Sequence, residues 1–171
     1  VSQILSFSRK AEVEQRLINL APVVNESLKL LRSSIPTSID IRQNISNDTD
    51  DILGDTTQIH QIMINLCTNA AHAMENEGGI LEITIENITI DEDTASRYPQ
   101  LHPGPYVHLS VSDTGDGMET EVVDRIFDPY FTTKGVGKGT GLGLSVVHGI
   151  VNSHNGRISV ESGAGKGTTF K

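Results

Sequence analysis

The glycine-rich stretch GKGTGLGLS, residues 137–145, has a composition suited to holding a phosphate group. Gly139, Gly141 and Gly143 alternate with other residues directly before an apolar, helix-forming run. A helix N-terminus offers unpaired N–H groups and a partial positive charge, and glycine lets a ligand approach that backbone closely. Neither the P-loop pattern nor the GxGxxG dinucleotide pattern occurs here. The stretch therefore predicts either a phosphate site of another type or a flexible linker.

A second candidate for ligand chemistry is the carboxylate at the end of the run YVHLSVSD. Val107, Leu109 and Val111 share one face of the expected strand, and Asp113 is the next residue on that face. A carboxylate at the end of a buried row needs a donor, and the exocyclic amine of a purine is one candidate. In the following TGDGM, Gly115 and Gly117 bend the chain and expose backbone. The alternative is an aspartate that only caps a turn.

The third candidate is the helix expected over residues 55–79, with Asp55 as its N-cap and two glycines at its end. Beside its apolar face runs a stripe of mostly amide side chains: Gln58, Gln61, Asn65, Asn69, His72 and Asn76. Amide oxygens can help to ligate Mg²⁺, which takes its remaining oxygens from water and nucleotide phosphates. An ordinary polar helix face is the alternative. Cys67 is expected to be a small buried apolar residue and not a nucleophile.

Together these pieces resemble the catalytic domain of sensor histidine kinases. QIMINLCTNAAHAM is similar to the N-box of that family, DTGDGM to its first glycine box and FDPYFTTK to its phenylalanine box. GKGTGLGLS resembles the second glycine box, and GAGKGTTF a closing glycine–threonine motif. The five motifs occur in the family's order over residues 55–170, and this ordered set is far more specific than any one of them.

The resemblance implies the Bergerat ATP-binding fold, an α+β two-layer sandwich in which helices cover one face of a mixed, mostly antiparallel sheet. It implies ATP and Mg²⁺ as cofactors, with Asn69 as the metal ligand. The implied catalytic residues are Asn65 and Lys134, with Lys134 reaching the terminal phosphate. The other implied nucleotide-binding residues are Asp113, Gly115, Gly117 and Thr168 around adenine, Phe127 and Phe131 as anchors of an ATP lid, and Thr133, Gly139, Thr140, Gly141, Leu142 and Gly143 along the lid and the phosphates.

Two departures bear on the chemistry. Many members of the family carry Lys or Arg three residues after the metal asparagine, where this chain has His72, so a phosphate contact from His72 is not expected. ATPases of the gyrase and heat-shock-chaperone type have a water-activating Glu one turn before that asparagine. Asn65 stands there, and an amide cannot act as a general base. The alternatives to a histidine kinase are such an ATPase and a nucleotide-binding module without catalysis.

The phosphoacceptor of the family is a His followed by an acidic residue, and none of the six histidines fits. QILSFSRK resembles the tail of the second dimerisation helix, so residues 1–14 are expected to be its remnant and a linker, with the catalytic domain over 15–171. The implied partners are the upstream dimerisation and phosphoacceptor helices and the receiver domain of a response regulator.

The composition supports one globular domain of 171 residues, with 36% apolar residues and few aromatics. Its net charge of −9 and its lack of a basic run disfavour nucleic acid and direct membrane contact. A cytoplasmic location is expected because ATP is there, although the parent protein could be membrane-tethered.

The elements that position these residues are expected to be strands and helices without strict alternation. Strands are expected at 15–20, 37–45, 80–90, 106–113 and in a final hairpin, and helices at 21–34, 119–127 and 142–154 besides 55–79. The apolar phase of 80–90 slips near Asn87, which predicts a bulge or the end of that strand. Residues 91–104 are expected to form a polar loop.

Overall fold

A computed structural model describes residues 15–46, 48–133 and 140–171. Its centre is a five-stranded sheet in the order β2-β4-β5-β7-β6. These strands span Ile39–Ile45, Gly79–Ile90, Gly104–Asp113, Thr168–Phe170 and Val160–Ser162, taken in that spatial order. Only β2 and β4 pair in parallel, so the sheet is mixed and mostly antiparallel, as predicted.

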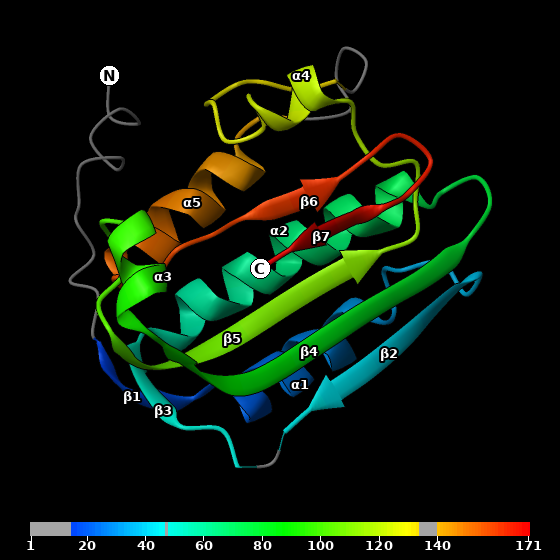
Figure 1. Cartoon of the computed structure of the whole chain (residues 1–171). Coiled ribbons are helices and arrows are strands. Elements are labelled where there is room, and N and C mark those ends of the chain that lie inside the picture. Colours follow the sequence, from blue (N-terminus) through cyan, green and yellow to red (C-terminus); the bar gives the residue numbers. More distant parts are fainter. Residues whose placement is uncertain (1–14, 47, 134–139) are drawn as a thin grey trace, which may run out of the picture.

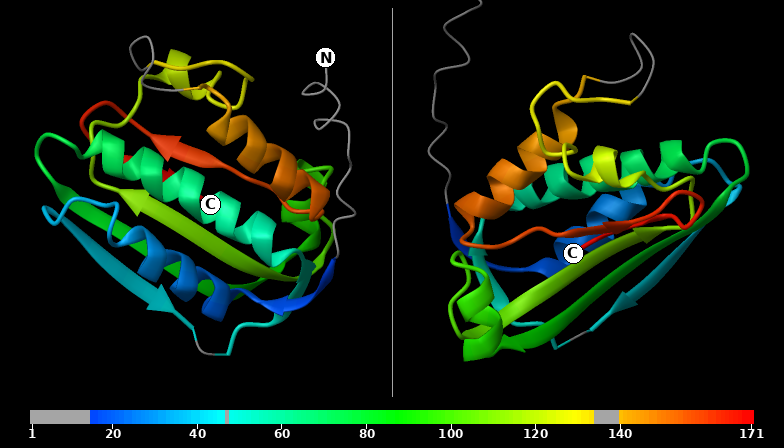
Figure 2. Two further views of the ribbon diagram at one scale, coloured as in Figure 1. Left: turned by 180° about the vertical axis from the view of Figure 1, so that it is seen from behind. Right: turned by 45° about the horizontal axis from the view of Figure 1, so that its top comes forward.

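Helices cover one face of this sheet. They lie behind the sheet in Figure 1 and in front of it in the left view of Figure 2. They are α1 (Leu20–Leu31), α2 (Thr56–Ala73) and α5 (Gly143–Ser153). Fully buried side chains from the helices, such as Val24 and Met63, meet Leu81, Ile83 and Ile85 of β4. This two-layer packing confirms the predicted α+β sandwich. None of the described helices has both the length and the apolar character needed to cross a membrane.

A separate two-stranded ribbon joins the helical layer. β1 (Arg16–Asn19) pairs antiparallel with β3 (Asp51–Gly54), a strand that the sequence did not predict. Asn19 then caps α1 by accepting a hydrogen bond from the Ala21 N–H. Asp55 caps α2 as predicted, because its carboxylate accepts from the N–H groups of Thr57 and Gln58 at 2.7 and 3.3 Å.

The bulge or strand end predicted near Asn87 is wrong, because β4 continues in register to Ile90. Asn87 pairs with Val107 of β5, and its side-chain amide forms hydrogen bonds with the backbone of the loop before β3. The amide donates to the Asp48 carbonyl oxygen and accepts from the Asp50 N–H, both at 2.9 Å. The polar residue therefore does not end the strand, since it has hydrogen-bond partners on the core side of the sheet.

The loop predicted over 91–104 contains a short helix, α3 (Glu92–Arg97). Asp91 caps it by accepting from the Thr94 N–H at 2.8 Å. The helix is polar on all sides and buries none of its residues, so no apolar periodicity marked it in the sequence. Another short helix, α4 (Thr120–Val123), lies within the expected helical stretch 119–127.

Candidate functional site

The phosphate end of the site forms where α5 begins beside α2. A Cβ added to Gly143 would lie 3.1 Å from Oδ1 of Asn65, so the glycine lets the first turn of α5 lie against that amide. At the other end of the two helices the Asp55 N–H donates to Nε2 of His154 at 3.3 Å. The helices therefore run antiparallel, and α2 fixes α5 at both ends (Figure 2).

The first turn of α5 begins at an N-cap residue whose N–H donates to the Thr140 hydroxyl at 3.4 Å. Leu142 is the N-cap residue, and no described side chain caps the helix there. The first N–H groups of a helix have no partner within it, so they point out beside Asn65. Asn69 lies one turn further along α2 and is half-buried. The structure thus brings Asn65 of α2 beside Gly143 in the first turn of α5.

The opposite end of the site is built around Asp113, the last residue of β5. It lies between Leu81 of β4 and Thr168 of β7, and its side chain is 7% exposed. One carboxylate oxygen accepts from the Gly115 N–H at 2.9 Å. Burial raises the pKa of Asp113, and the nearby Asp116 adds to that rise, whereas hydrogen bonds from the Gly115 and Thr168 backbones oppose it. Asp113 is therefore the buried acceptor that the strand pattern predicted.

Two glycines after Asp113 bring its loop against the end of α2. A Cβ on Gly115 would lie 2.5 Å from the Ala73 carbonyl oxygen, and the Asp116 N–H donates to that same oxygen at 3.1 Å. Gly117 has a φ of 66° and packs against the Gly163 carbonyl of the β6–β7 turn. A side chain at either position would push the loop away from α2 or from the turn. The close packing of the loop therefore requires glycine at both predicted positions, Gly115 and Gly117.

Thr168 is held by a network that the sequence analysis missed. Its hydroxyl lies 2.9 Å from that of Ser162, which also accepts from the Met118 N–H at 2.9 Å. The Gly165 N–H donates to the Asp116 carbonyl at 2.7 Å. Ser162 is thus a positioning residue between the β6–β7 hairpin and the loop after Asp113. The only signal in the sequence is its place five residues before the closing GTTF, which is too weak to predict a contact.

The two aromatic rings of the phenylalanine motif pack against different parts of the molecule. The Phe127 ring lies 5.3 Å from the His148 ring of α5 and 6.5 Å, edge-on, from the Phe170 ring. The Arg125 guanidinium lies 4.4 Å from the centre of the Phe131 ring. Phe127 therefore anchors this segment to α5 and β7, and Phe131 is fixed closer to α4.

A backbone contact joins the two motifs directly. The Tyr130 N–H donates to the Gly141 carbonyl oxygen at 2.9 Å, and both residues have positive φ, 67° and 65°. Positive φ favours glycine and strains Tyr130, whose side chain is 77% exposed. Thr133 and Thr140 are exposed on either side of the contact. The predicted Lys134 and Gly139, and most of the predicted lid, lie outside the described residues.

The chemistry of the donor set fits Mg²⁺. The described residues contain no cluster of three or more His, Cys, Asp or Glu side chains that could hold a metal on its own. Mg²⁺ keeps several waters and uses nucleotide phosphate oxygens, so one or two amide oxygens from α2 are a suitable protein contribution. Asn65 Oδ1 faces the helix terminus where those phosphates would lie.

Comparisons with known proteins agree with this geometry. The family described as "Histidine kinase-, DNA gyrase B-, and HSP90-like ATPase" matches residues 54–171. The chain belongs to this family of ATPases. The matched residues begin just before α2 and include every motif named above.

Within the family, the chain is similar to sensor kinases. It is 39% identical to Sensor kinase CckA of Brucella abortus over 171 residues, which is all of this chain and 18% of CckA. It is 34% identical to Sensor histidine kinase ZraS of Escherichia coli, over 99% of this chain and 33% of ZraS. The chain thus spans a third or less of the length of these relatives.

Solved structures show the same fold. The catalytic domain of histidine kinase ThkA superposes with a TM-score of 0.71 at 31% identity, over 92% of both chains. A structure of ThkA in complex with the response regulator protein TrrA superposes with a TM-score of 0.70 at 27% identity, over 98% of this chain and 43% of that one. The chain therefore carries the nucleotide-binding fold of a histidine kinase catalytic domain.

Proposed function

We propose that this domain binds Mg·ATP and transfers the terminal phosphoryl group to a histidine that lies outside the chain. The observation that carries the proposal is the placement of two complementary subsites at α2. The buried Asp113 lies near the C-terminal end of this helix, and Asn65 faces the first turn of α5 further back along it. A nucleotide bound between them would place adenine at Asp113 and its phosphates at α5.

Each end of this proposed site has hydrogen-bond donors or acceptors that suit the part of the nucleotide placed there. Asp113 accepts a hydrogen bond from the adenine amine, beside the one that it accepts from the Gly115 N–H. The N–H groups at the start of α5 donate to phosphate oxygens. Asn69, with Asn65 beside it, would hold Mg²⁺, and the bound ion would supply charge neutralisation on the phosphates. The family resemblance assigns Lys134 to the transferred group, and catalysis would be mainly positioning and charge stabilisation.

Two features favour transfer to a protein over hydrolysis. Asn65 stands where the related ATPases have a carboxylate that activates water, and its amide cannot accept a proton. None of the six histidines is followed by an acidic residue, so the acceptor belongs to another segment or domain. We place it on upstream helices, with residues 1–14 as the remnant of the second one, in a parent protein that acts in the cytoplasm.

A response regulator is the proposed downstream partner. The relative ThkA has been solved with the response regulator protein TrrA, and this chain superposes on 98% of its length with that kinase. The receiver domain takes the phosphoryl group from the phosphorylated histidine. A net charge of −9 gives no reason to propose nucleic acid or membrane as a partner of this chain.

The test is a transfer assay with separated parts. The chain is mixed with radiolabelled ATP and a folded domain that carries the parent protein's upstream helical hairpin. We expect label on the hairpin in an acid-labile bond and none on this chain. A hairpin whose histidine is replaced by alanine is the control. Labelling of this chain alone, or no transfer although ATP binds, would contradict the proposal.

A further inference from the structure

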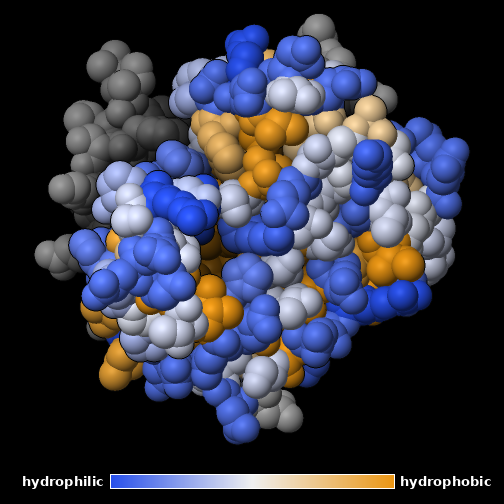
Figure 3. All heavy atoms as spheres, in the orientation of Figure 1, coloured by the Kyte–Doolittle hydropathy of each residue, from blue (hydrophilic) through white to orange (hydrophobic). Residues whose placement is uncertain are grey.

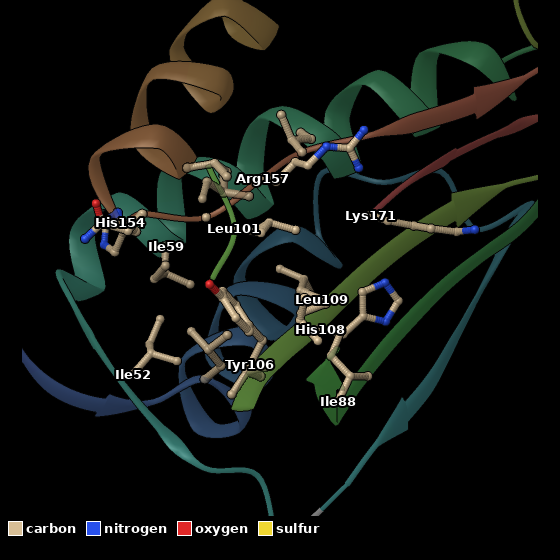
Figure 4. Close-up of a pocket in the computed structure, with 18 of the residues that line it drawn as sticks. Ile52, Ile59, Ile88, Leu101, Tyr106, His108, Leu109, His154, Arg157 and Lys171 are labelled. Carbon is tan, nitrogen blue, oxygen red and sulfur yellow. The ribbon is translucent and has the colours of Figure 1, made fainter. Parts of the chain in front are cut away.

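The central sheet ends in two outer strands, β2 on one side and β6 on the other. β6 has three residues, whereas β2 has seven and borders the sheet in Figure 1. A further open stretch, the first half of β5, lies inside the sheet beside an apolar cavity of about 760 Å³ among Ile59, Tyr106 and Leu109 (Figure 4). The segment leading into β6 bounds that cavity on its other side. β2 is therefore the longest edge that a strand of another molecule can reach.

The hydrogen bonds between β2 and β4 show which backbone groups of β2 are left over. The Gly79 N–H donates to the Ser38 carbonyl oxygen at 3.3 Å, and the Ser46 N–H donates to the Ile85 carbonyl oxygen at 3.0 Å. Alternate residues of a strand bond to the same neighbour, so the even-numbered residues from 38 to 46 bond to β4. The odd-numbered residues of β2 therefore direct their N–H and C=O groups away from β4.

Three of these odd-numbered residues face outward with no described strand beside them. The backbone groups of Ile39 are already used by the loop before β2 and by the Arg32 guanidinium. The next residues of this set are Ile41, Gln43 and Ile45. β2 contains no proline and stays in register with β4 over its whole length. It thus lacks a bulge or proline of the kind that protects many edge strands from pairing.

The sequence of this edge is complementary to itself. When two copies of residues 41–45 pair antiparallel about Gln43, Ile41 faces Ile45 of the second copy and the two Gln43 side chains face each other. These are hydrogen-bonded pairs, which exchange both N–H···O bonds, so the outward groups of all three residues find partners. On the open face of the sheet, Arg42 faces Asn44 of the second copy, so no like charges meet directly.

The side chains beside this edge leave room for the second strand. Ile41 and Ile45 are half-buried and pack against the core, on the side that the helices cover. A groove of about 530 Å³ lies between β2 and the last turns of α1, with Leu28, Lys29 and Ile41 in its wall. Ile45 of the second copy, opposite Ile41, would enter this groove and remove apolar surface from water. The other face of the sheet carries mostly polar side chains, as Figure 3 shows.

We propose that two copies of this chain associate through β2, antiparallel about a two-fold axis at Gln43, so that their five-stranded sheets join into one. Such an interface uses the same surface of both molecules, so association stops at the dimer. The net charge of −9 on each chain opposes association. Salt screens this repulsion, so the dimer should become stronger as ionic strength rises.

The test is sedimentation equilibrium of the 171-residue chain over a range of concentrations, without nucleotide. We expect the mass to rise from that of one chain to that of two and no further. In amide hydrogen exchange read by NMR, the Gln43 N–H should become at least ~10-fold more protected as the dimer forms. The Asn44 N–H bonds to β4 and should be protected throughout. A single chain at all concentrations, or a dimer that protects Leu109 of β5 and not Gln43, would overturn the proposal.

Charge variants at the two-fold axis make the test specific. Gln43→Lys and Gln43→Glu each place like charges opposite each other and should weaken their own dimers at least ~10-fold. An equal mixture of the two variants should form a heterodimer, because lysine then faces glutamate. The Gln43 side chain is exposed, so both variants should fold. Gln100→Lys makes the same change in the exposed loop after α3 and should dimerise like the wild type. Undiminished dimerisation of Gln43→Lys, or no heterodimer in the mixture, would contradict pairing at this axis.

Discussion

At the scale of single residues, the site depends on a carboxylate that folding makes more basic. Asp113 is buried, and one of its oxygens is already bonded to the Gly115 N–H. Burial of a charge disfavours folding, and only part of that cost is offset by two backbone donors. The ionised residue thus lowers the stability of the empty site. This combination is typical of binding residues and is not expected of a simple turn cap.

Replacing Asp113 by asparagine tests that role. We expect Asp113→Asn to weaken ADP binding by ~1–3 kcal/mol, because the adenine amine loses a charged acceptor or meets an amide donor. The melting temperature should stay the same or rise, since a buried charge is removed. Isothermal titration calorimetry and thermal unfolding measure the two effects. Asp116→Asn, an exposed neighbour, is the control and should bind ADP normally.

The raised pKa of Asp113 also predicts a pH dependence. Its protonated form is favoured in the folded protein, so its contribution to stability is full below the unfolded pKa and is lost as pH rises through the folded pKa. Adenine binding has the opposite trend, because it needs the ionised form. We expect ADP affinity to fall on acidification at a pH above the ordinary aspartate value of 3.8. Titration of ADP itself is common to wild type and Asp113→Asn, so only the wild type should show this additional fall.

Cys67 is the one thiol of the chain, and it lies fully buried in the core side of α2. Burial raises its pKa to about 12, so thiolate is almost absent at neutral pH. We expect no reaction with iodoacetamide in the folded protein and rapid reaction in urea, as measured by mass spectrometry. Labelling of the native protein on the same time scale as unfolded protein would contradict the buried position.

At the scale of elements, α5 contains two glycines with different roles. Gly143 lies against Asn65, whereas a Cβ on Gly149 would meet nothing within 4 Å. Gly143→Ala should displace Asn65 and weaken ATP binding by ~1–2 kcal/mol, the size of one or two hydrogen bonds. Gly149→Ala should leave ATP binding unchanged and stabilise the fold by ~0.5–1 kcal/mol, because alanine favours a helix. Calorimetry and urea unfolding of both variants separate the two roles, and equal ATP affinity of the Gly143 variant would remove the Asn65 contact from the site.

The sequence predicted those elements whose pattern is local. Asp55 capped the expected helix, and the alternation of Val107, Leu109 and Val111 placed Asp113 on the buried face correctly. The slip at Asn87 was misinterpreted because its partners, Asp48 and Asp50, are far away in sequence. Ser162 was missed for the same reason. Contacts between distant loops leave no period in a sequence, so only the structure reveals them.

At the scale of the whole molecule, the two subsites come from segments that are far apart in the chain but meet along α2. The family resemblance predicted this assembly. No single sequence pattern could predict it, because each pattern also fitted an ordinary turn, a linker or a polar helix face. The roles of all the site residues in binding and catalysis stay predictions, among them Lys134, Gly139 and the Mg²⁺ contact of Asn69, and so does the boundary between residues 14 and 15.

The isolated chain should hydrolyse ATP slowly. Asn65 lies beside the phosphate subsite, where an amide orients groups but does not remove a proton from water. We expect turnover below ~1 per second in a coupled phosphate-release assay, the lower end of ordinary enzyme rates. Asp113→Asn should reduce even this rate if it arises from the site. Turnover of many ATP per second that depends on Asp113 would favour the gyrase-like alternative.

The pairing of β5 with β7 has a consequence for how the protein becomes active during its synthesis. Ser112 and Thr169 hydroxyls are 2.8 Å apart in space and 57 residues apart along the chain. A ribosome adds residues at about 5–20 per second, so several seconds separate the appearance of Asp113 from that of the strand that buries it. Until then Asp113 lacks its neighbour Thr168, whose backbone donates to its carboxylate in the folded domain. The nascent domain therefore cannot complete the surroundings of Asp113 before its closing hairpin has left the exit tunnel.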